Sequence, residues 1–389
     1  MTAPRPDTHV LACACPYGSG GLGRHFAQLV EEARREGRLL RYYARAGRPG
    51  DEALVEPVPR SFSRVGYAVR YRLPEAWKAR VIKYPESEAF DRAVAARLVP
   101  AARYTAFAGK ALHSGREARR LGVERVEVVA PNSHVDDVAR LHRLAAAQTG
   151  IRDTWLSEAE RCKTRREYDE ADVVLVHSDY VWASMLRHGV PEAKLERTVL
   201  RLPARFAPPA VRPDDGVFRL VYVGRLEATK GLPVLLDAFR RLPVAEAELR
   251  LVGGWTSKPM RRAIQAAAAA DPRIRVGPGD PVPALHRADA YVHPTFEDGY
   301  AYSPVEALAC GVPVVVTEET GMKEYVAEGE NGYVVPVGDA DALVERLLAL
   351  RERPLRACRS LLDPALVASS DDPGALAAPP AAMPAPAHG

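Results

Sequence analysis

The stretch Thr295–Thr317 (TFEDGYAYSPVEALACGVPVVVT) constrains the fold more than any other part of the chain. Its pattern predicts a loop, then a short helix with Ser303 as the N-cap and Pro304 at the first helical position. Gly311 ends that helix. The uninterrupted apolar run Val312–Val316 is typical of a strand buried on both faces. The stretch therefore predicts a parallel sheet that helices cover on both sides.

Two acids flank the predicted helix start. Asp298 and Glu306 are eight residues apart, one on each side of it. Because a helix N-terminus presents free N–H groups and a partial positive charge, this arrangement favours a ligand with an anionic centre and hydroxyl groups at both ends. A nucleotide sugar has that composition. The alternative for Glu306 is a capping box, in which its side chain bonds only back to the N–H of Ser303.

Short apolar strands alternate with helical stretches on both sides of a Pro-rich linker at Leu202–Gly216. With 389 residues, the chain is long enough for two domains. We predict an α/β fold of two Rossmann-like, doubly wound domains that face each other across a cleft, over residues 1–205 and 206–352. The Pro/Ala-rich tail, 353–389, is expected to be disordered. The strands expected in the second domain are Phe218–Val223, Glu248–Gly253, Ile274–Gly277, Ala290–His293, Val312–Thr317 and Gly332–Pro336.

Composition excludes several classes of protein. No apolar run approaches the ~18 residues of a membrane span, and the first residues lack the pattern of a secretory signal. The five cysteines are scattered, odd in number and without CxxC spacing, so they indicate reduced thiols and neither a disulfide framework nor a zinc site. We therefore expect a cytoplasmic protein without a metal.

The segment Pro59–Tyr84 holds seven Lys or Arg residues and one acid, Glu75, interleaved with aromatic side chains. Such a segment is typical of a surface that binds an anionic membrane or nucleic acid. The alternative is an ordinary solvated face of an Arg-rich protein. Of the two partners we expect the membrane, with peripheral contact at its inner face, and no nucleic acid.

A glycine-rich loop follows the first predicted strand, His9–Ala14. Gly18, Gly20 and Gly23 match GxGxxG before an amphipathic helix, the setting of a dinucleotide fingerprint. The next strand ends in Arg45 and not in an acid. Because an arginine there suits a 2′-phosphate, an NADP-dependent oxidoreductase is an alternative.

Two cations and a histidine complete the candidate residues. Arg225 is expected in the loop after the first strand of the second domain and Lys230 in the first turn of the helix that follows, where the two predict a clamp for a diphosphate. The alternative is two ordinary surface cations. His134 follows the predicted strand Val126–Ala130, at the strand end where open α/β sheets bind ligands, although a lone histidine there more often has a loop or capping role.

Three segments in order, GRLEATKG, EDGYAYSPVEALACGVPVVVT and GENGYVVPVGDADAL, resemble the group 1 (GT4) glycosyltransferases, a retaining family with the GT-B fold. The resemblance extends from about Phe218 to Leu350 and, more weakly, over the first half, and it implies an acceptor-binding first domain and a donor-binding second domain. Asp298 stands in place of the first glutamate of the family's E-x7-E motif and Ala301 in place of a usual glycine. By resemblance, the catalytic residues are Asp298, which contacts the transferred sugar, and His134, on the acceptor side. The resemblance also implies that Arg225 and Lys230 bind the donor diphosphate and that Glu306 binds the ribose. The remaining contacts with the phosphates and the sugar are implied for the backbone of Gly299, Tyr300 and Ala301 and for the loop residues Gly20 and Gly21.

The resemblance implies a retaining transfer of a hexose from a UDP- or GDP-linked sugar to an acceptor hydroxyl on a glycan or lipid-linked molecule, in cell-surface polysaccharide or glycolipid synthesis. The nucleotide sugar is a co-substrate, and neither a cofactor nor a metal is implied; Asp339 and Asp341 look like a DxD motif but fit a helix cap better. A non-catalytic sugar-nucleotide-binding protein and a nucleotide-sugar epimerase are further alternatives, the first because Asp298 and Ala301 depart from the family pattern.

Overall fold

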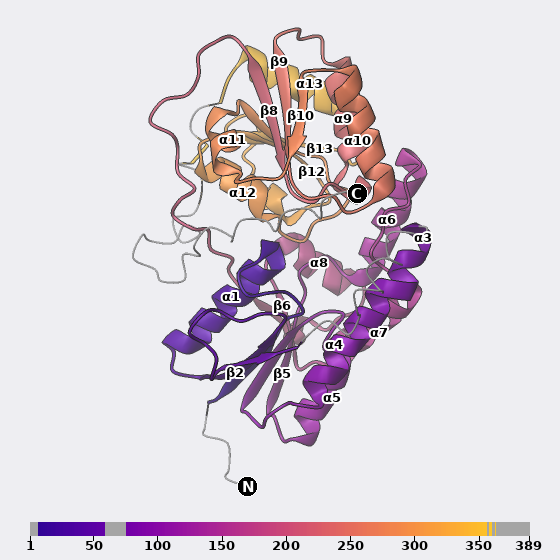
Figure 1. Cartoon of the computed structure of the whole chain (residues 1–389), viewed down its shortest axis with the longest axis vertical. Coiled ribbons are helices and arrows are strands. Elements are labelled where there is room, and N and C mark those ends of the chain that lie inside the picture. Colours follow the sequence, from indigo (N-terminus) through magenta and orange to yellow (C-terminus); the bar gives the residue numbers. More distant parts are fainter. Residues whose placement is uncertain (1–6, 59–74, 356–357, 360–361, 363–389) are drawn as a thin grey trace, which may run out of the picture. The chain divides into compact units, whose positions relative to one another are not determined.

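The computed structural model describes residues 7–58, 75–355, 358–359 and 362 (Figure 1). The chain forms two compact units. The first comprises the residues up to Leu141 together with Thr154–Leu200, and the second comprises His142–Asp153 together with the residues from Arg201 onward. Among the described helices, none combines the length and apolar character needed to cross a membrane.

The first unit is built on a seven-stranded parallel sheet of order β3-β2-β1-β4-β5-β6-β7. Successive side chains along β1 and the residue after it point to opposite faces of this sheet. Val10 and Ala12 belong to the hydrophobic core on one face, and Leu11 and Cys13 belong to the core on the other. The strands are β1 His9–Ala12, β2 Leu39–Ala44, β3 Val55–Pro57, β4 Arg103–Phe107, β5 Arg125–Val129, β6 Val173–Val176 and β7 Leu195–Arg197.

Helices connect these strands. They are α1 Gly20–Arg35, α3 Glu75–Lys78, the π-helix η1 Ala79–Lys83, α4 Tyr84–Ala95, α5 Leu112–Arg120, α6 Val135–Thr149, α7 Glu158–Glu170, α8 Asp179–Arg187 and the short η2 Glu192–Lys194. Helix α6 contributes residues to both units, because the division falls between Leu141 and His142.

The second unit is built on a six-stranded parallel sheet of order β10-β9-β8-β11-β12-β13. All six strands expected from the sequence are present, and their ends differ from the prediction by at most two residues. The strands are β8 Phe218–Val223, β9 Ala247–Val252, β10 Ile274–Gly277, β11 Ala290–His293, β12 Val314–Thr317 and β13 Gly332–Val335. The helices are η3 Ala228–Lys230, α9 Leu232–Arg241, α10 Lys258–Ala270, α11 Val282–Arg287, α12 Tyr302–Ala309, η4 Gly321–Tyr325 and α13 Ala340–Glu352.

The order of this sheet reverses between β8 and β11. The chain moves outward from β8 through β9 to β10, then returns to the other side of β8 and continues from β11 to β13. The loops after β8 and β11 therefore leave the same sheet edge in opposite directions. Doubly wound folds bind their ligands outside the strand ends at such a switch point.

Two details of the predicted domain limits differ from the structure. The second unit begins at Arg201, and residues 142–153 pack with it, whereas the prediction placed all residues up to 205 in the first domain. The predicted disordered tail also begins too early: Cys358 and Leu362 are buried, and Arg359 donates to the backbone oxygens of Phe206 and Ala309 at 3.0 and 2.8 Å. These contacts hold that part of the tail on the second unit. Residues 363–389, and the part of the basic segment at 59–74, lie outside the described residues.

Candidate functional site

The two loops at the switch point of the second unit meet through an ion pair. The Nζ atom of Lys230, after β8, donates to Oδ2 of Asp298, after β11, at 2.7 Å, and to the carbonyl oxygen of Glu297 at 3.1 Å. Both side chains are largely shielded from solvent. The structure thus brings together a predicted phosphate-binding cation and a predicted sugar-binding acid, 68 residues apart in the sequence.

His293, the last residue of β11, completes this group. Its Nε2 atom lies 3.4 Å from Oδ2 of Asp298. Burial lowers the pKa of His293, so the ring is neutral at pH 7 and can donate one N–H. Burial also opposes ionisation of Asp298, but Lys230 and His293 outweigh it and hold the pKa of the carboxyl well below its usual range. Asp298 is therefore a carboxylate, which can accept hydrogen bonds.

Arg225 lies in the same loop but has a different environment. Its side chain is 55% exposed, and Nη1 lies 2.9 Å from Oε1 of Glu227, which is buried. Arg225 can therefore reach a ligand from solvent while its guanidinium keeps one anionic partner. Each of the two cations already has an acid partner, Glu227 for Arg225 and Asp298 for Lys230, so the structure does not show them as a clamp with both charges free for a ligand.

The position of Lys230 differs from the prediction, which placed it in the first turn of the following helix. Lys230 ends the 3-10 turn η3, and Gly231 separates it from α9 with a left-handed φ of +72°. A Cβ atom at Gly231 would lie 1.7 Å from the carbonyl oxygen of Pro294. Only glycine fits there, and this close approach brings Lys230 to the loop that follows β11.

The prediction that Ser303 caps the helix α12 is wrong. Helix α12 begins at Tyr302 with Ala301 as its N-cap, and no side chain caps it. The hydroxyl of Ser303 instead contacts the hydroxyl of Tyr291 at 2.8 Å, and the Tyr291 hydroxyl also lies 3.0 Å from the carbonyl oxygen of Val223. Tyr291 thereby ties the end of β8 to the start of α12, and this tertiary contact decides the orientation of Ser303.

The new helix start excludes the capping box for Glu306. A capping box requires the acid at the third helical residue, which is Pro304 when Ala301 is the N-cap. Glu306 is buried on α12 and Tyr300 is buried just before it. Ala301 itself has φ +62° and ψ +94°, a strained conformation for a residue with a side chain. The strain lies where the resemblance expects glycine. The proposed ligand contacts of Gly299, Tyr300, Ala301 and Glu306 stay predictions.

The candidates of the first unit are placed as follows. Gly20 and Gly21 open helix α1 and are exposed, and Gly23 approaches Pro16 so closely that a Cβ atom would lie 2.5 Å from its carbonyl oxygen. The sequence motif therefore forms a tight turn before a helix. The Arg45 side chain donates to the carbonyl oxygen of Val58 at 3.1 Å and lies over the ring of Phe90. These packing contacts disfavour its use for a 2′-phosphate.

His134 stands at the start of α6 and is buried. Its Nδ1 accepts the backbone N–H of Asp136 at 3.3 Å, and its ring stacks on His188 with 4.3 Å between centroids. Burial and then His188 lower the pKa of His134 to about 4. The ring is therefore neutral, and because Nδ1 is an acceptor, its proton is on Nε2. The capping alternative matches these local bonds, and the catalytic role stays a prediction.

Two clusters of the first unit offer three possible metal ligands each, namely Glu88, Asp91 and His113, and His134, Asp136 and His188. In each cluster, the carboxylates are already paired with a cationic side chain. Lys163 lies 2.7 Å from Glu88 and 2.8 Å from Asp91, and Arg165 donates to Asp136 at 2.8 Å.

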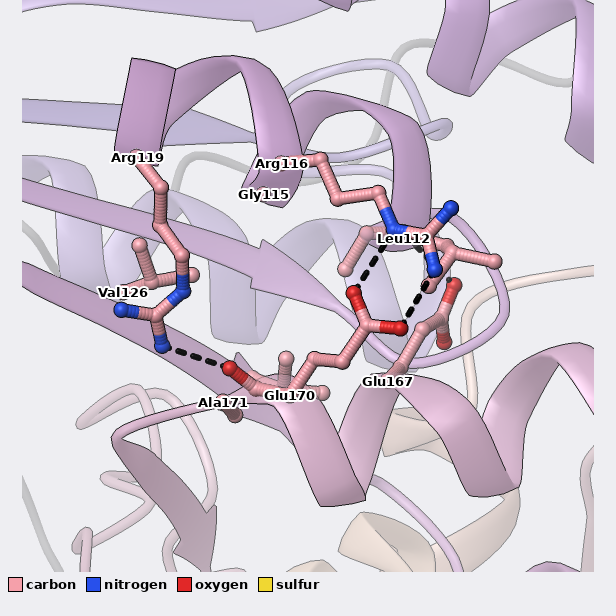
Figure 2. A pocket seen from close by; sticks show the side chains of 10 residues that line it. Leu112, Gly115, Arg116, Arg119, Val126, Glu167, Glu170 and Ala171 are labelled. Carbon is pink, nitrogen blue, oxygen red and sulfur yellow. Dashed lines mark hydrogen bonds and ion pairs between the residues drawn. The ribbon is translucent and has the colours of Figure 1, made fainter. Parts of the chain in front are cut away.

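A small pocket lies between α5 and α7 (Figure 2). Leu112, Val126 and Glu167 line it, and Arg116 donates to Glu170 at 2.7 Å at its side. Its volume is about 10 Å³. A space of this size holds about one water molecule, so it is not a site for a nucleotide sugar.

Sequence reasoning missed three residues of the switch-point site: His293, Glu227 and Tyr291. The strand AYVH offered a signal for His293, because a histidine at the carboxyl end of a buried strand lies at the ligand-binding edge of the sheet. Nothing local identified Glu227, which is buried by tertiary packing, or Tyr291, which looks like an ordinary core residue of β11.

Comparisons with known proteins show which chains and folds this protein resembles. Residues 205–360 match the family model described as glycosyl transferases group 1. WcaL of Escherichia coli (strain K12), named for colanic acid biosynthesis, is 30% identical over 200 residues, which cover 48% of this chain and 49% of WcaL. The chain spans about half the length of the curated relatives that head this comparison.

Solved structures show the fold. Sucrose-phosphate synthase from Thermosynechococcus elongatus aligns with a TM-score of 0.70 at 20% identity, over 91% of this chain and 92% of that one. HepE of Anabaena, solved in complex with UDP-glucose, aligns with a TM-score of 0.65 at 15% identity, over 91% and 93%. The predicted GT-B fold is confirmed by these likenesses.

Proposed function

We propose that this chain, whose residues 205–360 match the group 1 glycosyltransferase family model, transfers a hexose from a UDP- or GDP-linked sugar to a hydroxyl of a glycan or lipid-linked acceptor. The observation that carries the proposal is the Lys230–Asp298 pair at the switch point, beside the half-exposed Arg225. The UDP-glucose complex of HepE supports a nucleotide sugar as donor, and the name of WcaL supports a place in polysaccharide synthesis.

Ligand binding would exchange the ion pairs. Before binding, Lys230 and Asp298 neutralise each other in a site with little access to water. A diphosphate offers Lys230 a stronger anionic partner, and the sugar hydroxyls offer donors to the released Asp298 carboxylate. The neutral His293 lies beside Asp298, with its Nε2 atom 3.4 Å from Oδ2. Without ligand, the pair therefore keeps both charged groups neutralised, so that neither is an unpaired buried charge.

The same cations serve the reaction. As the sugar–phosphate bond breaks, negative charge develops on the leaving diphosphate, where Arg225 and Lys230 stabilise it more than in the ground state. The family resemblance implies retention: the leaving phosphate oxygen takes the proton of the acceptor hydroxyl, which attacks on the same face of the sugar. Because two side chains supply the positive charge, we expect transfer to continue in EDTA.

A thermal-shift screen tests the donor. UDP, GDP and their sugars are compared with NADPH, and a ligand at 100 times its Kd is expected to stabilise the chain by about 2.7 kcal/mol. Lys230→Ala and Arg225→Ala should reduce the shift. Arg240→Ala, which removes an exposed cation from α9, should leave it unchanged. A shift with NADPH alone, or full shifts in both site variants, would refute the proposal.

Turnover separates the alternatives that share the donor site. A glycosyltransferase hydrolyses its donor slowly without an acceptor and gives a product that keeps the anomeric configuration of the donor. A binding protein leaves the donor intact, and an epimerase changes the sugar while it stays attached to the nucleotide. Nuclear magnetic resonance of a donor incubated with the chain distinguishes these three results.

We also propose peripheral contact with an anionic membrane through α3 and η1. The side chains of Trp77 and Val81 are 62% and 44% exposed, and Arg80 is exposed beside them. An apolar pair next to cations is the composition of an interfacial helix. Trp77→Ser with Val81→Ser should reduce co-sedimentation with vesicles that contain an anionic phospholipid. Trp255→Ser removes an exposed tryptophan of the second unit and should not. Equal binding of both variants would exclude this surface.

A further inference from the structure

The loop that carries Arg225 and Lys230 does not cap its own turn. The 3-10 turn η3 begins at Ala228, and its N-cap residue, Glu227, makes no side-chain capping bond. Glu227 instead pairs with Arg225 and accepts the hydroxyl of Thr229 at 3.1 Å. The N–H of Ala228 therefore donates its hydrogen bond to another part of the chain.

That part is Asp153, the last residue of the segment 142–153. Its Oδ2 atom accepts the N–H of Ala228 at 3.4 Å and the hydroxyl of Ser257 at 2.8 Å. Ser257 is the N-cap of α10, and its oxygen accepts the N–H of Met260. One carboxylate oxygen thus joins the starts of two helical elements that follow the neighbouring strands β8 and β9.

Two further bonds fasten these loops to each other. The hydroxyl of Thr256 donates to the carbonyl oxygen of Leu226 at 2.9 Å, and the N–H of Leu226 donates to the carbonyl oxygen of Gly254 at 3.0 Å. Asp153 is 8% exposed, so its hydrogen bonds compete little with water. Its carboxylate therefore closes a small network whose other members flank Arg225.

We infer that Asp153 is a positioning residue, which sets the backbone of the Arg225–Lys230 loop for a diphosphate through its bonds to Ala228 and Ser257. The inference rests on the proposed function, since the diphosphate is the ligand proposed there. Asp153 contacts this loop through the backbone N–H of Ala228. It acts on affinity because an anion site loses binding energy when its two cations must be ordered at the moment of binding.

The chain offers a matched control for this role. Asp339 is the N-cap of α13 and accepts the N–H of Ala342 at 2.9 Å, so it also bonds the first turn of a helix in the second unit. In the part of the chain that the structure describes, its hydrogen bonds stay within residues 336–343 and do not reach the Arg225–Lys230 loop. Asp339→Ala should destabilise the second unit through the loss of this cap, as Asp153→Ala does through the loss of its own two bonds, but without an effect on ligand binding.

Calorimetric titration of the full chain with UDP and with GDP tests the inference. Asp153→Ala is expected to weaken the binding of the preferred diphosphate about tenfold, while Asp339→Ala stays within about twofold of the parent chain. Asp153→Asn keeps an oxygen that accepts both hydrogen bonds, and it should recover affinity to within about threefold. Equal affinities of Asp153→Ala and Asp339→Ala, or an Asp153→Asn as weak as Asp153→Ala, would overturn the inference.

Hydrogen exchange measured without ligand separates this inference from the proposed function. Amides of residues 226–231 should exchange at least about fivefold faster in Asp153→Ala and at the parent rate in Asp339→Ala. A parent chain that binds neither UDP nor GDP would overturn the proposed function and the diphosphate role of Asp153. Unchanged exchange in the loop would overturn the positioning role even where the parent chain binds a diphosphate.

Discussion

Replacing Ala301 with glycine should stabilise the second unit, although glycine usually destabilises a folded chain. Ala301 has φ +62° and ψ +94° at the N-cap of α12. For a residue with a Cβ atom this conformation costs about 1–2 kcal/mol, and glycine adopts it without that cost. Against this gain stands the larger conformational entropy of glycine in the unfolded chain, about 0.5–1 kcal/mol.

The difference predicts a gain of about 0.5–1 kcal/mol in the free energy of unfolding. For a unit of about 150–250 residues, that corresponds to a rise in Tm of roughly 1–4 °C. The removed methyl group contributes little, since Ala301 is only partly buried. Native-state hydrogen exchange of amides in β11 and α12, read as a function of urea, measures the stability of this unit separately from the first.

Ala266→Gly provides the control with the opposite sign. Ala266 is exposed inside helix α10, where glycine should cost about 1 kcal/mol. If Ala301→Gly lowered the free energy of unfolding as Ala266→Gly does, the strain at the start of α12 would not exist in solution, and the reasoning would fail.

Three further variants test packing and charge. Lys163→Met should destabilise the first unit by about 3–5 kcal/mol in urea denaturation at pH 7, because it leaves the buried carboxylate of Asp91 without its cation and removes one partner of the partly buried Glu88; a loss below about 1 kcal/mol would show that the ion pairs are unimportant. Burial lowers the pKa of His9 from 6.5 to about 3, so its contribution to stability is complete above pH 6.5 and decreases as the pH falls. The parent chain should lose about 2 kcal/mol through this group between pH 6.5 and 5, and His9→Gln should lack that part of the slope; an identical slope would contradict the assignment. Gly231→Ala should lower the free energy of unfolding by about 2–4 kcal/mol, because the new Cβ atom would lie 1.7 Å from the carbonyl oxygen of Pro294. An unchanged free energy of unfolding would mean that Gly231 and Pro294 are farther apart in solution than in this structure.

Much of the fold follows from local pattern. A buried parallel strand is a short apolar run and an amphipathic helix has its own period, so the six strands of the second unit could be located from the residues alone. The loops with Lys230 and Asp298 were identified in the same way, because they follow predicted strands at the ligand-binding edge of the sheet. The sequence by itself therefore determined the fold class and the part of the chain that holds the candidate site.

Only the tertiary structure decided how the site residues are used. The pairing of Lys230 with Asp298 and the bonds of Asp153 join positions 68 to 104 residues apart, and the side-chain directions at those positions depend on the packing of crossovers that local pattern does not contain. Ser303 has the local pattern of an N-cap, yet its hydroxyl is hydrogen-bonded to the hydroxyl of Tyr291 on β11, and α12 begins earlier, at Tyr302. Local propensities of a few tenths of a kcal/mol to about 1 kcal/mol are easily outweighed by such buried contacts, which is why the elements were predictable and their partners were not.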